Sequence, residues 1–189
     1  MTSQATRTPD STSLRFRRAA GRFPTGVAVV STLNDAQPHA MTVNSFVTVS
    51  LEPLMVLVSL GLTCRTYERI HSSGIFAVTV LGAHQQPVAD WFASSRRGTG
   101  AGAFTGVDWR PAPCSSAPIL EQGVSYFDCQ VVDVRVAGDH AVVFGAVQAF
   151  DVLSDGPALM FADSRYVACP SPPAASVNGA ATPAVPSQR

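Results

Sequence analysis

Three small polar side chains stand directly before a run of apolar residues: Thr42, Asn44 and Ser45. Two runs rich in β-branched residues follow, 46–51 and 54–60, and both read as buried strands. Hydroxyl and amide side chains before a strand can bond to their own backbone in turns and caps. They can also form a polar shelf for a ligand on the rim of an apolar sheet. Spacing alone leaves both interpretations open.

The cysteines and histidines do not form a metal-binding pattern. The histidines show no HxxxH or HExxH spacing, and the cysteines are widely spaced with no CxxC pair. We therefore expect free thiols and no metal site. The chain also lacks the GxSxG pattern of a serine hydrolase, and its acidic residues are too few and scattered to predict a glycosidase. The residues concerned are Cys64, Cys114, Cys129, Cys169, His39, His71, His84 and His140.

Two adjacent arginines, Arg96 and Arg97, lie in the glycine-rich segment 94–103. A basic loop of this kind can neutralise a phosphate group. A plain solvated loop is the alternative. The segment does not match the GxxxxGK[ST] pattern of a nucleoside-triphosphate-binding loop.

The elements that would position these side chains are mostly strands. Helix-like patterns are few, and no alternation of strand and helix predicts a parallel sheet. Thr63 or Thr66 can cap the middle helix, and Ser73-Gly74 would end it. The expected strands are 26–33, 39–44, 46–51, 54–60, 75–81, 125–136, 140–153 and a short one at 158–161; the expected helices are 14–23, 63–74 and 84–92; 105–124 reads as irregular. The pattern predicts a mostly β, antiparallel barrel or sandwich with two or three peripheral helices.

Composition indicates one lightly charged globular domain. Of 189 residues, 46% are hydrophobic and 14% charged, and 13 basic residues balance 13 acidic ones. The zero net charge gives no electrostatic footprint for nucleic acid or an anionic membrane. No apolar run approaches the ~20 residues of a membrane helix, and the N-terminus lacks the apolar region of a signal peptide, so we expect a cytoplasmic protein. We expect a disordered arm at 1–12, one domain at 13–169 and a disordered Pro/Ala/Ser tail at 170–189.

Seven segments, in order, carry a resemblance to a known family. They are FPTGVAVVST (23–32), HAMTVNSFVTVSLEPLMVLVSL (39–60), SGIFAVTVL (73–81), WFASS (91–95), GVDW (106–109), AGDHAVVFGAVQA (137–149) and SRY (164–166). Together they resemble the short-chain flavin reductases, the reductase components of two-component flavin-dependent monooxygenases. Within that family the chain is similar to reductases that serve actinomycete aromatic-polyketide oxygenases. The resemblance covers residues 14–168 and implies an FMN-binding split barrel, usually a homodimer with flavin near the subunit interface.

The resemblance implies a flavin-binding wall built from three segments. Met41, Thr42, Val43, Asn44 and Ser45 match the family's flavin segment and would hold the ring edge and the ribityl chain. Ser59, Leu60 and Gly61 would continue that wall. Cys64 and Thr66 stand where the family has S-x-T beside the flavin phosphate, at a helix N-terminus that would add partial positive charge. Cys64 departs from the usual serine, and a thiol is a weaker hydrogen-bond donor.

The remaining site residues follow from shorter matches. Pro24 and Thr25 would lie close to the ring, and Phe92 and Ala93 match the family's FA pair. Ala103 stands where the family has a basic residue, so Arg96 or Arg97 would supply the charge at the phosphate. His140, in Gly138-Asp139-His140, matches the family's GDH segment on the nicotinamide side and is the expected catalytic residue. Arg165 and Tyr166 match its G-R-Y segment, where Arg165 could contact phosphate or NAD(P)H and Ser164 is a departure.

The resemblance therefore implies an NAD(P)H:flavin oxidoreductase. NADH or NADPH would pass hydride to N5 of FMN or FAD, and reduced flavin would diffuse to a partner flavin-dependent monooxygenase. The flavin carries the chemistry, and the protein positions it. The alternative is a split-barrel flavin- or haem-binding protein without turnover, such as a carrier or sensor.

Overall fold

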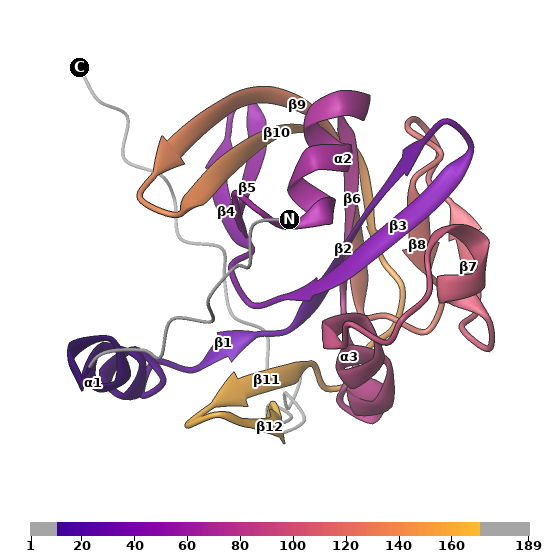
Figure 1. Cartoon of the computed structure of the whole chain (residues 1–189). Helices are drawn as coiled ribbons and strands as arrows, with labels where there is room; N and C mark the ends of the chain where they lie inside the picture. The colour runs from indigo at the N-terminus through magenta and orange to yellow at the C-terminus, as the bar shows by residue number, and fades with distance from the viewer. Residues whose placement is uncertain (1–10, 171–189) are drawn as a thin grey trace, which may run out of the picture.

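The computed structural model describes residues 11–170, and its centre is a seven-stranded antiparallel sheet in the order β3-β2-β6-β9-β10-β5-β4. Figure 1 shows this sheet curled around a core, with the helices outside it. The strands of the sheet are β2 (Ala28–Asn34), β3 (Gln37–Val43), β4 (Val47–Leu51), β5 (Leu54–Gly61), β6 (Ile75–Val80), β9 (Ser125–Ala137) and β10 (His140–Val152). The other strands are β1 (Thr25–Gly26), β7 (Trp109–Pro111), β8 (Pro118–Leu120), β11 (Leu159–Ala162) and β12 (Arg165–Ala168). The helices are α1 (Ser11–Ala20), α2 (Arg65–Ser73), α3 (Gln86–Ala93) and two 3-10 turns, η1 (Ala83–Gln85) and η2 (Gly100–Phe104).

Alternation along the strands builds the core of the barrel. In β2, Ala28 and Val30 point inward and join Val58 of β5 and Phe76 of β6 in one buried cluster. Ile70 of α2 belongs to the same cluster, so the helix closes one end of the barrel. Residues from strands near both edges of the sheet share this core, which requires the sheet to curl. The mostly β, antiparallel prediction is confirmed, and β3 and β4 form the two edges of the split barrel.

A second core covers the outer face of β2. Val27 and Val29 alternate with the barrel residues and pack against Phe92 of α3 and Phe104 of η2. The rings of Phe92 and Phe104 have centroids 5.2 Å apart. Because α3 packs against this face, it holds the loop that starts at Ser94 beside β3.

The long strand β10 joins the two halves of the barrel. It pairs with β9 along its whole length, but with β5 only from His140 to Ala146. A Cβ on Gly145 would meet Phe76 Cζ at 2.5 Å, so only glycine fits where β10 crosses the core. This register places the β9–β10 turn beside the end of β5.

The N-terminal helix α1 stands away from the sheet, beside the β11–β12 hairpin, and has no buried residue. Arg22 pairs with Asp163 at 2.8 Å, and the Asp163 backbone N–H donates to the Gly21 carbonyl at 2.8 Å. Leu14 and Phe16 are exposed on it. No helix within residues 11–170 has the length and apolarity needed to cross a membrane.

Several expected boundaries were wrong. The segment 105–124 is not wholly irregular, because β7 and β8 form a short hairpin within it. Residues 100–104 of the expected loop form η2, and β12 was missed. Of the expected arm, residues 11 and 12 begin α1; residues 1–10 and the tail from 171 lie outside the described residues.

Candidate functional site

A small cavity of about 190 Å³ lies between the end of β3, α3 and the β11–β12 hairpin. Its size suits part of a ligand, because whole-ligand pockets are usually larger, roughly 300–1,000 Å³. Five of its seven lining residues were predicted from the resemblance. The lining residues are Val27, Thr42, Val43, Asn44, Ala93, Phe161 and Tyr166.

The polar side chains after β3 divide into two kinds. Thr42 Oγ1 donates to the Ala89 carbonyl of α3 at 2.7 Å. Ser45 Oγ donates to the Ser59 carbonyl at 2.8 Å and accepts from the Ser59 N–H at 3.1 Å, which fastens the chain to β5. Asn44 is exposed and its side chain makes no hydrogen bond within residues 11–170, so it remains free for a ligand. Thr42 and Ser45 therefore bond to the protein's own backbone, whereas Asn44 is available to a ligand.

His140 lies directly beside the end of the predicted wall. It is paired in register with Gly61, and Val142 is paired with Ser59. The Leu62 N–H donates to the Asp139 carbonyl at 3.0 Å, which ties the turn to the chain after β5. Two segments that are far apart in the sequence thus form one surface.

The His140 ring is half exposed and held in one orientation. Its Nδ1 lies 2.7 Å from Asp139 Oδ1, and its side chain is 49% exposed. This hydrogen bond lowers the pKa of the Asp139 carboxyl, with the nearby imidazole charge as the next cause. An ionised carboxylate only accepts hydrogen bonds, so Nδ1 carries the proton and Nε2 faces solvent.

The N-terminus of α2 is capped by Cys64, not by Thr63 or Thr66 as the sequence suggested. The Cys64 backbone is extended, and its Sγ accepts from the Tyr67 N–H at 3.4 Å. Thr66 lies inside the first turn, is fully buried and bonds through Oγ1 to His39 Nε2 at 3.1 Å. Gly74 ends the helix in a left-handed conformation, as predicted.

His39 was not singled out from the sequence, although it opens the flavin-like segment. It is 3% exposed, and burial lowers its pKa to about 4, with further lowering by Arg97, Arg69 and Arg65. His39 is therefore neutral near pH 7 and links β3 to α2 without adding charge. Only its position between the strand and the helix reveals this role.

Of the two candidate arginines, Arg97 faces the site. Its Nε donates to the Ala40 carbonyl of β3 at 3.0 Å, and Nη1 donates to the Ser94 carbonyl at 2.7 Å. Burial and the charge of Arg65 lower its pKa, which places the two guanidinium groups near each other. Arg97 keeps further N–H donors for a ligand, since a guanidinium has five. The Arg96 side chain is exposed and makes no hydrogen bond or ion pair within residues 11–170.

Phe161 and Tyr166, from the β11–β12 hairpin, line the cavity, and β1 lies next to them. Thr25 pairs with Phe161, and its Oγ1 is buried without a hydrogen-bond partner in the described chain. Tyr166 packs edge-on against Phe161, with ring centroids 5.3 Å apart. Burial, and then the charge of Asp90, raises the pKa of Tyr166. Pro24 and Arg165 are exposed, and neither lines this cavity.

Several expected site residues lie in the hydrophobic cores that support the wall. Leu60 and Phe92 belong to the two cores and expose almost nothing, so a direct contact with a ligand would require them to move. Met41 packs at the edge of the barrel core. Val27 and Phe161 line the cavity and were missed, because apolar residues in strands carry no signal of a site. Within residues 11–170, no cluster of side chains suits a metal ion, and all four cysteines are free thiols.

These residues fit a flavin in chemical type. A helix N-terminus with arginines suits a phosphate, and the free amide of Asn44 suits polar atoms of the ring or the ribityl chain. The buried Thr25 hydroxyl has no hydrogen-bond partner in the described chain, so a ligand could supply one. The apolar cavity walls suit the ring itself.

Comparisons with known proteins identify similar domains. Residues 20–170 match the model of the flavin reductase like domain. The reductase subunit HsaB of a flavin-dependent monooxygenase from Mycobacterium tuberculosis is 40% identical over 144 residues, covering 76% of this chain and 73% of that protein. The NADH-dependent FMN reductase AsuE2 of Streptomyces nodosus subsp. asukaensis is 43% identical over 135 residues, covering 70% and 71%. The structure of the NADH:FAD oxidoreductase SgcE6 of Streptomyces globisporus superposes with a TM-score of 0.78 at 32% identity, covering 87% of this chain and 98% of that one.

Proposed function

Because this chain belongs to the family of flavin reductase like domains, we propose that it is an NADH-dependent flavin reductase that supplies reduced FMN or FAD to a partner flavin-dependent monooxygenase. The enzyme transfers a hydride from the nicotinamide to the flavin. Bound flavin supplies the acceptor atom, N5 of its ring, and the protein supplies position and electrostatics. We propose residues 13–169 as its single domain.

One observation carries this proposal: His140 lies in register with Gly61 at the end of the flavin-binding wall. A flavin-binding wall alone would be enough for a carrier that binds flavin without turnover. A histidine with a free Nε2 beside that wall supports a second ligand, the nicotinamide, next to the ring. The Asp139 carboxylate fixes the imidazole orientation through Nδ1.

The other residues would bind the flavin and orient it. Asn44 and the backbone of residues 41–45 would bond to the ring edge and ribityl chain, with Tyr166 lining the same cavity and Thr25 on β1, paired with Phe161. Cys64, the free N–H groups of the first turn of α2 and Arg97 would hold the phosphate. Neutral His39 keeps Thr66 and the helix start against β3.

A simple assay tests the proposal. Purified protein is mixed with FMN or FAD and NADH, and absorbance is followed at the nicotinamide band. We expect flavin-dependent loss of NADH and, with NADPH in its place, a slower rate. Tight flavin binding without any loss of NADH or NADPH would instead identify a carrier or sensor and overturn the proposal.

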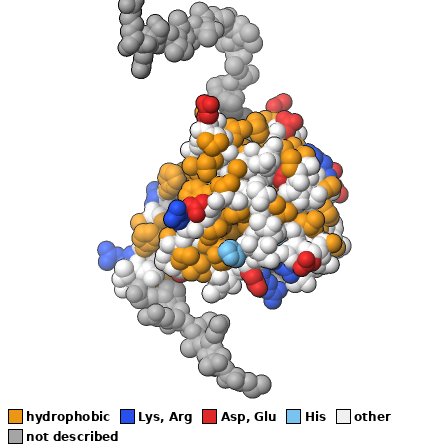
Figure 2. Space-filling model, turned by 90° about the horizontal axis from the view of Figure 1, so that it is seen from above, with side chains coloured by type: hydrophobic (Ala, Val, Ile, Leu, Met, Phe, Trp, Pro, Cys, Tyr) orange, Lys and Arg blue, Asp and Glu red, His pale blue; other side chains and the backbone are white. Residues whose placement is uncertain are grey.

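We also propose a homodimer. An apolar groove of about 210 Å³ lies between β4, β5 and β10, with Leu51 and Phe150 exposed on its rim by 86% and 56%. Figure 2 looks onto this end of the molecule and shows hydrophobic side chains gathered over a broad area with few charges among them. Exposed apolar areas of this kind mark association surfaces. Phe150 lies ten residues from His140 along β10, roughly 30 Å by the rise of a strand, so this surface is separate from the His140 end of β10.

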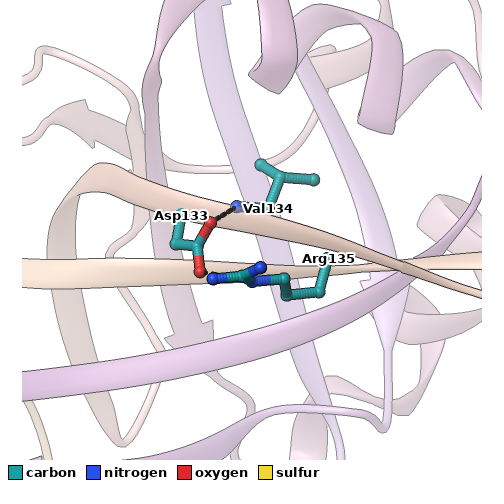
Figure 3. A network of polar contacts seen from close by, with 3 residues as sticks. All are labelled: Asp133, Val134 and Arg135. Atoms are coloured by element: carbon teal, nitrogen blue, oxygen red, sulfur yellow. Dashed lines mark hydrogen bonds and ion pairs between the residues drawn. The ribbon is translucent and has the colours of Figure 1, made fainter.

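One polar pair on β9 bears on that association. Figure 3 shows Asp133 between the Val134 amide, at 2.9 Å, and the Arg135 guanidinium, at 2.7 Å. In solvent such a pair contributes at most about 1 kcal/mol. Next to exposed Val132 and Val136 it would favour one orientation of a second copy, because charged groups at an interface fix register.

Reduced flavin would reach the oxygenase by diffusion in the cytoplasm, without nucleic acid or a membrane as partner. The zero net charge supports the last two points. Placing reductase and a flavin-dependent monooxygenase on opposite sides of a dialysis membrane tests the diffusion step. Product formation across the membrane is expected, and its loss despite NADH consumption would require direct contact between the proteins.

A further inference from the structure

A polar groove of about 460 Å³ runs along α2 beside the β2–β3 turn, and no residue of the flavin-binding wall lines it. It extends along α2 from Arg65, the first residue after the Cys64 cap, to Ser72. Its lining is Asn34, Asp35, Gln37, Arg65, Glu68, Arg69 and Ser72.

Two arginines dominate one wall of this groove. Arg65 and Arg69 are four residues apart on α2 and therefore lie on the same helix face. Like charges at this spacing repel each other, and within residues 11–170 neither makes an ion pair, although Glu68 and Asp35 line the same groove. Two unpaired guanidinium groups in a groove suit an extended anion.

The arginine row is continuous with the position proposed for the flavin phosphate. Arg97 bonds to the Ala40 carbonyl, and the adjacent His39 bonds to Thr66 of α2. Arg65 is the first residue of α2, directly after the Cys64 cap. Arg97, Arg65 and Arg69 therefore form a path from the start of the helix into the groove.

The length of this path distinguishes the two flavins. The phosphate of FMN is a compact group that the helix start and Arg97 can bind, and nothing in FMN extends beyond it. Arg69 lies one turn further along, about 6 Å by the helix rise. The second phosphate and the adenosine of FAD extend in that direction, where a guanidinium can pair with phosphate and stack on a planar base.

We propose that the groove between α2 and the β2–β3 turn, with Arg65 and Arg69, binds the second phosphate and adenosine of FAD, so that this enzyme prefers FAD to FMN. The inference rests on the proposed function. Asp35, in the β2–β3 turn, suits a ribose hydroxyl, since a carboxylate accepts a hydrogen bond from it.

Binding titrations with FAD and with FMN test this on the full chain, on Arg69→Gln and on Glu68→Gln. The unmodified protein should bind FAD on the order of tenfold more tightly than FMN, and Arg69→Gln should weaken FAD about five- to tenfold with FMN changed less than about twofold. Glu68→Gln removes a negative charge from the same groove and should tighten FAD. Arg18→Gln, an exposed arginine on α1, is the matched control and should change neither affinity.

Each other outcome overturns the inference. Equal losses for FMN and FAD in Arg69→Gln would show that the residue only supports α2. A raised KM for NADH with unchanged FAD affinity would assign the groove to the nicotinamide dinucleotide. If the enzyme turns over FMN and FAD equally well, the groove inference fails while the proposed function stands; if no flavin supports NADH oxidation, the proposed function itself fails.

Discussion

Replacing Gly61 with alanine should change stability and flavin binding in opposite directions. Gly61 is the last residue of β5, paired with His140, and a Cβ there would meet no heavy atom within 4 Å. Its backbone does not require positive φ, so alanine fits. Glycine in a strand costs roughly 0.5–1 kcal/mol relative to alanine. The unliganded Gly61→Ala protein should therefore melt about 1–4 °C higher.

Flavin binding should weaken in the same variant. If the ring lies against β5 at this point, the added methyl group occupies its space, and such overlap costs about 1–3 kcal/mol. That free energy corresponds to roughly a five- to 150-fold rise in Kd. Thermal unfolding without flavin and a fluorescence titration with FAD measure the two effects separately.

Gly102→Ala is the matched control, because a Cβ at Gly102 in η2 also meets nothing within 4 Å. It should leave the flavin Kd unchanged. A Gly61→Ala protein with raised Tm and unaltered flavin affinity would refute the placement of the flavin beside β5. A lowered Tm would refute the claim that the space at Gly61 is open.

Three further perturbations address the histidines and the proposed dimer. His140→Ala should lower kcat/KM for NADH on the order of tenfold while FAD affinity persists, and unchanged steady-state kinetics would exclude its role. Because burial lowers the pKa of folded His39 from 6.5 to about 4, stability is retained above pH 6.5 and lost as pH falls towards 4. Urea unfolding at pH 7 and pH 5 should show a loss of roughly 2 kcal/mol that His39→Gln, which keeps a partner for Thr66, does not show; equal losses would remove His39 as the cause. Leu51→Lys should weaken dimerisation at least about tenfold in sedimentation experiments, whereas Val167→Lys, also exposed, should not; a monomeric unmodified protein would end the dimer proposal.

The sequence predicted the main strands because β-branched alternation and turn residues are local signals. Ser73-Gly74 ends α2 as expected, since glycine alone adopts the left-handed cap without strain. The cap at the other end was missed. Ser, Thr, Asp and Asn are the usual capping residues, so Thr63 and Thr66 seemed better candidates than Cys64. The structure places Thr66 within the first turn, where its hydroxyl bonds to His39.

The parts of the site that depend on distant segments could not be predicted from spacing. Arg96 and Arg97 are adjacent in sequence, and only the packing of α3 against β3 turns Arg97 towards Ala40. The pairing of His140 with Gly61 depends on a register between strands that are far apart in the chain. The resemblance to flavin reductases supplied these residues, and the geometry explains how they meet.

The unequal pairing of β10 leaves an open hydrogen-bonding edge. Beyond Ala146 the strand still pairs with β9, but its pairing with β5 has stopped at Met55. An unpaired edge invites strand addition by another chain, and natural proteins blunt it with charge. In residues 147–152, VQAFDV, Asp151 carries the single charge. The charge of Asp151 therefore opposes the addition of a further strand along this edge.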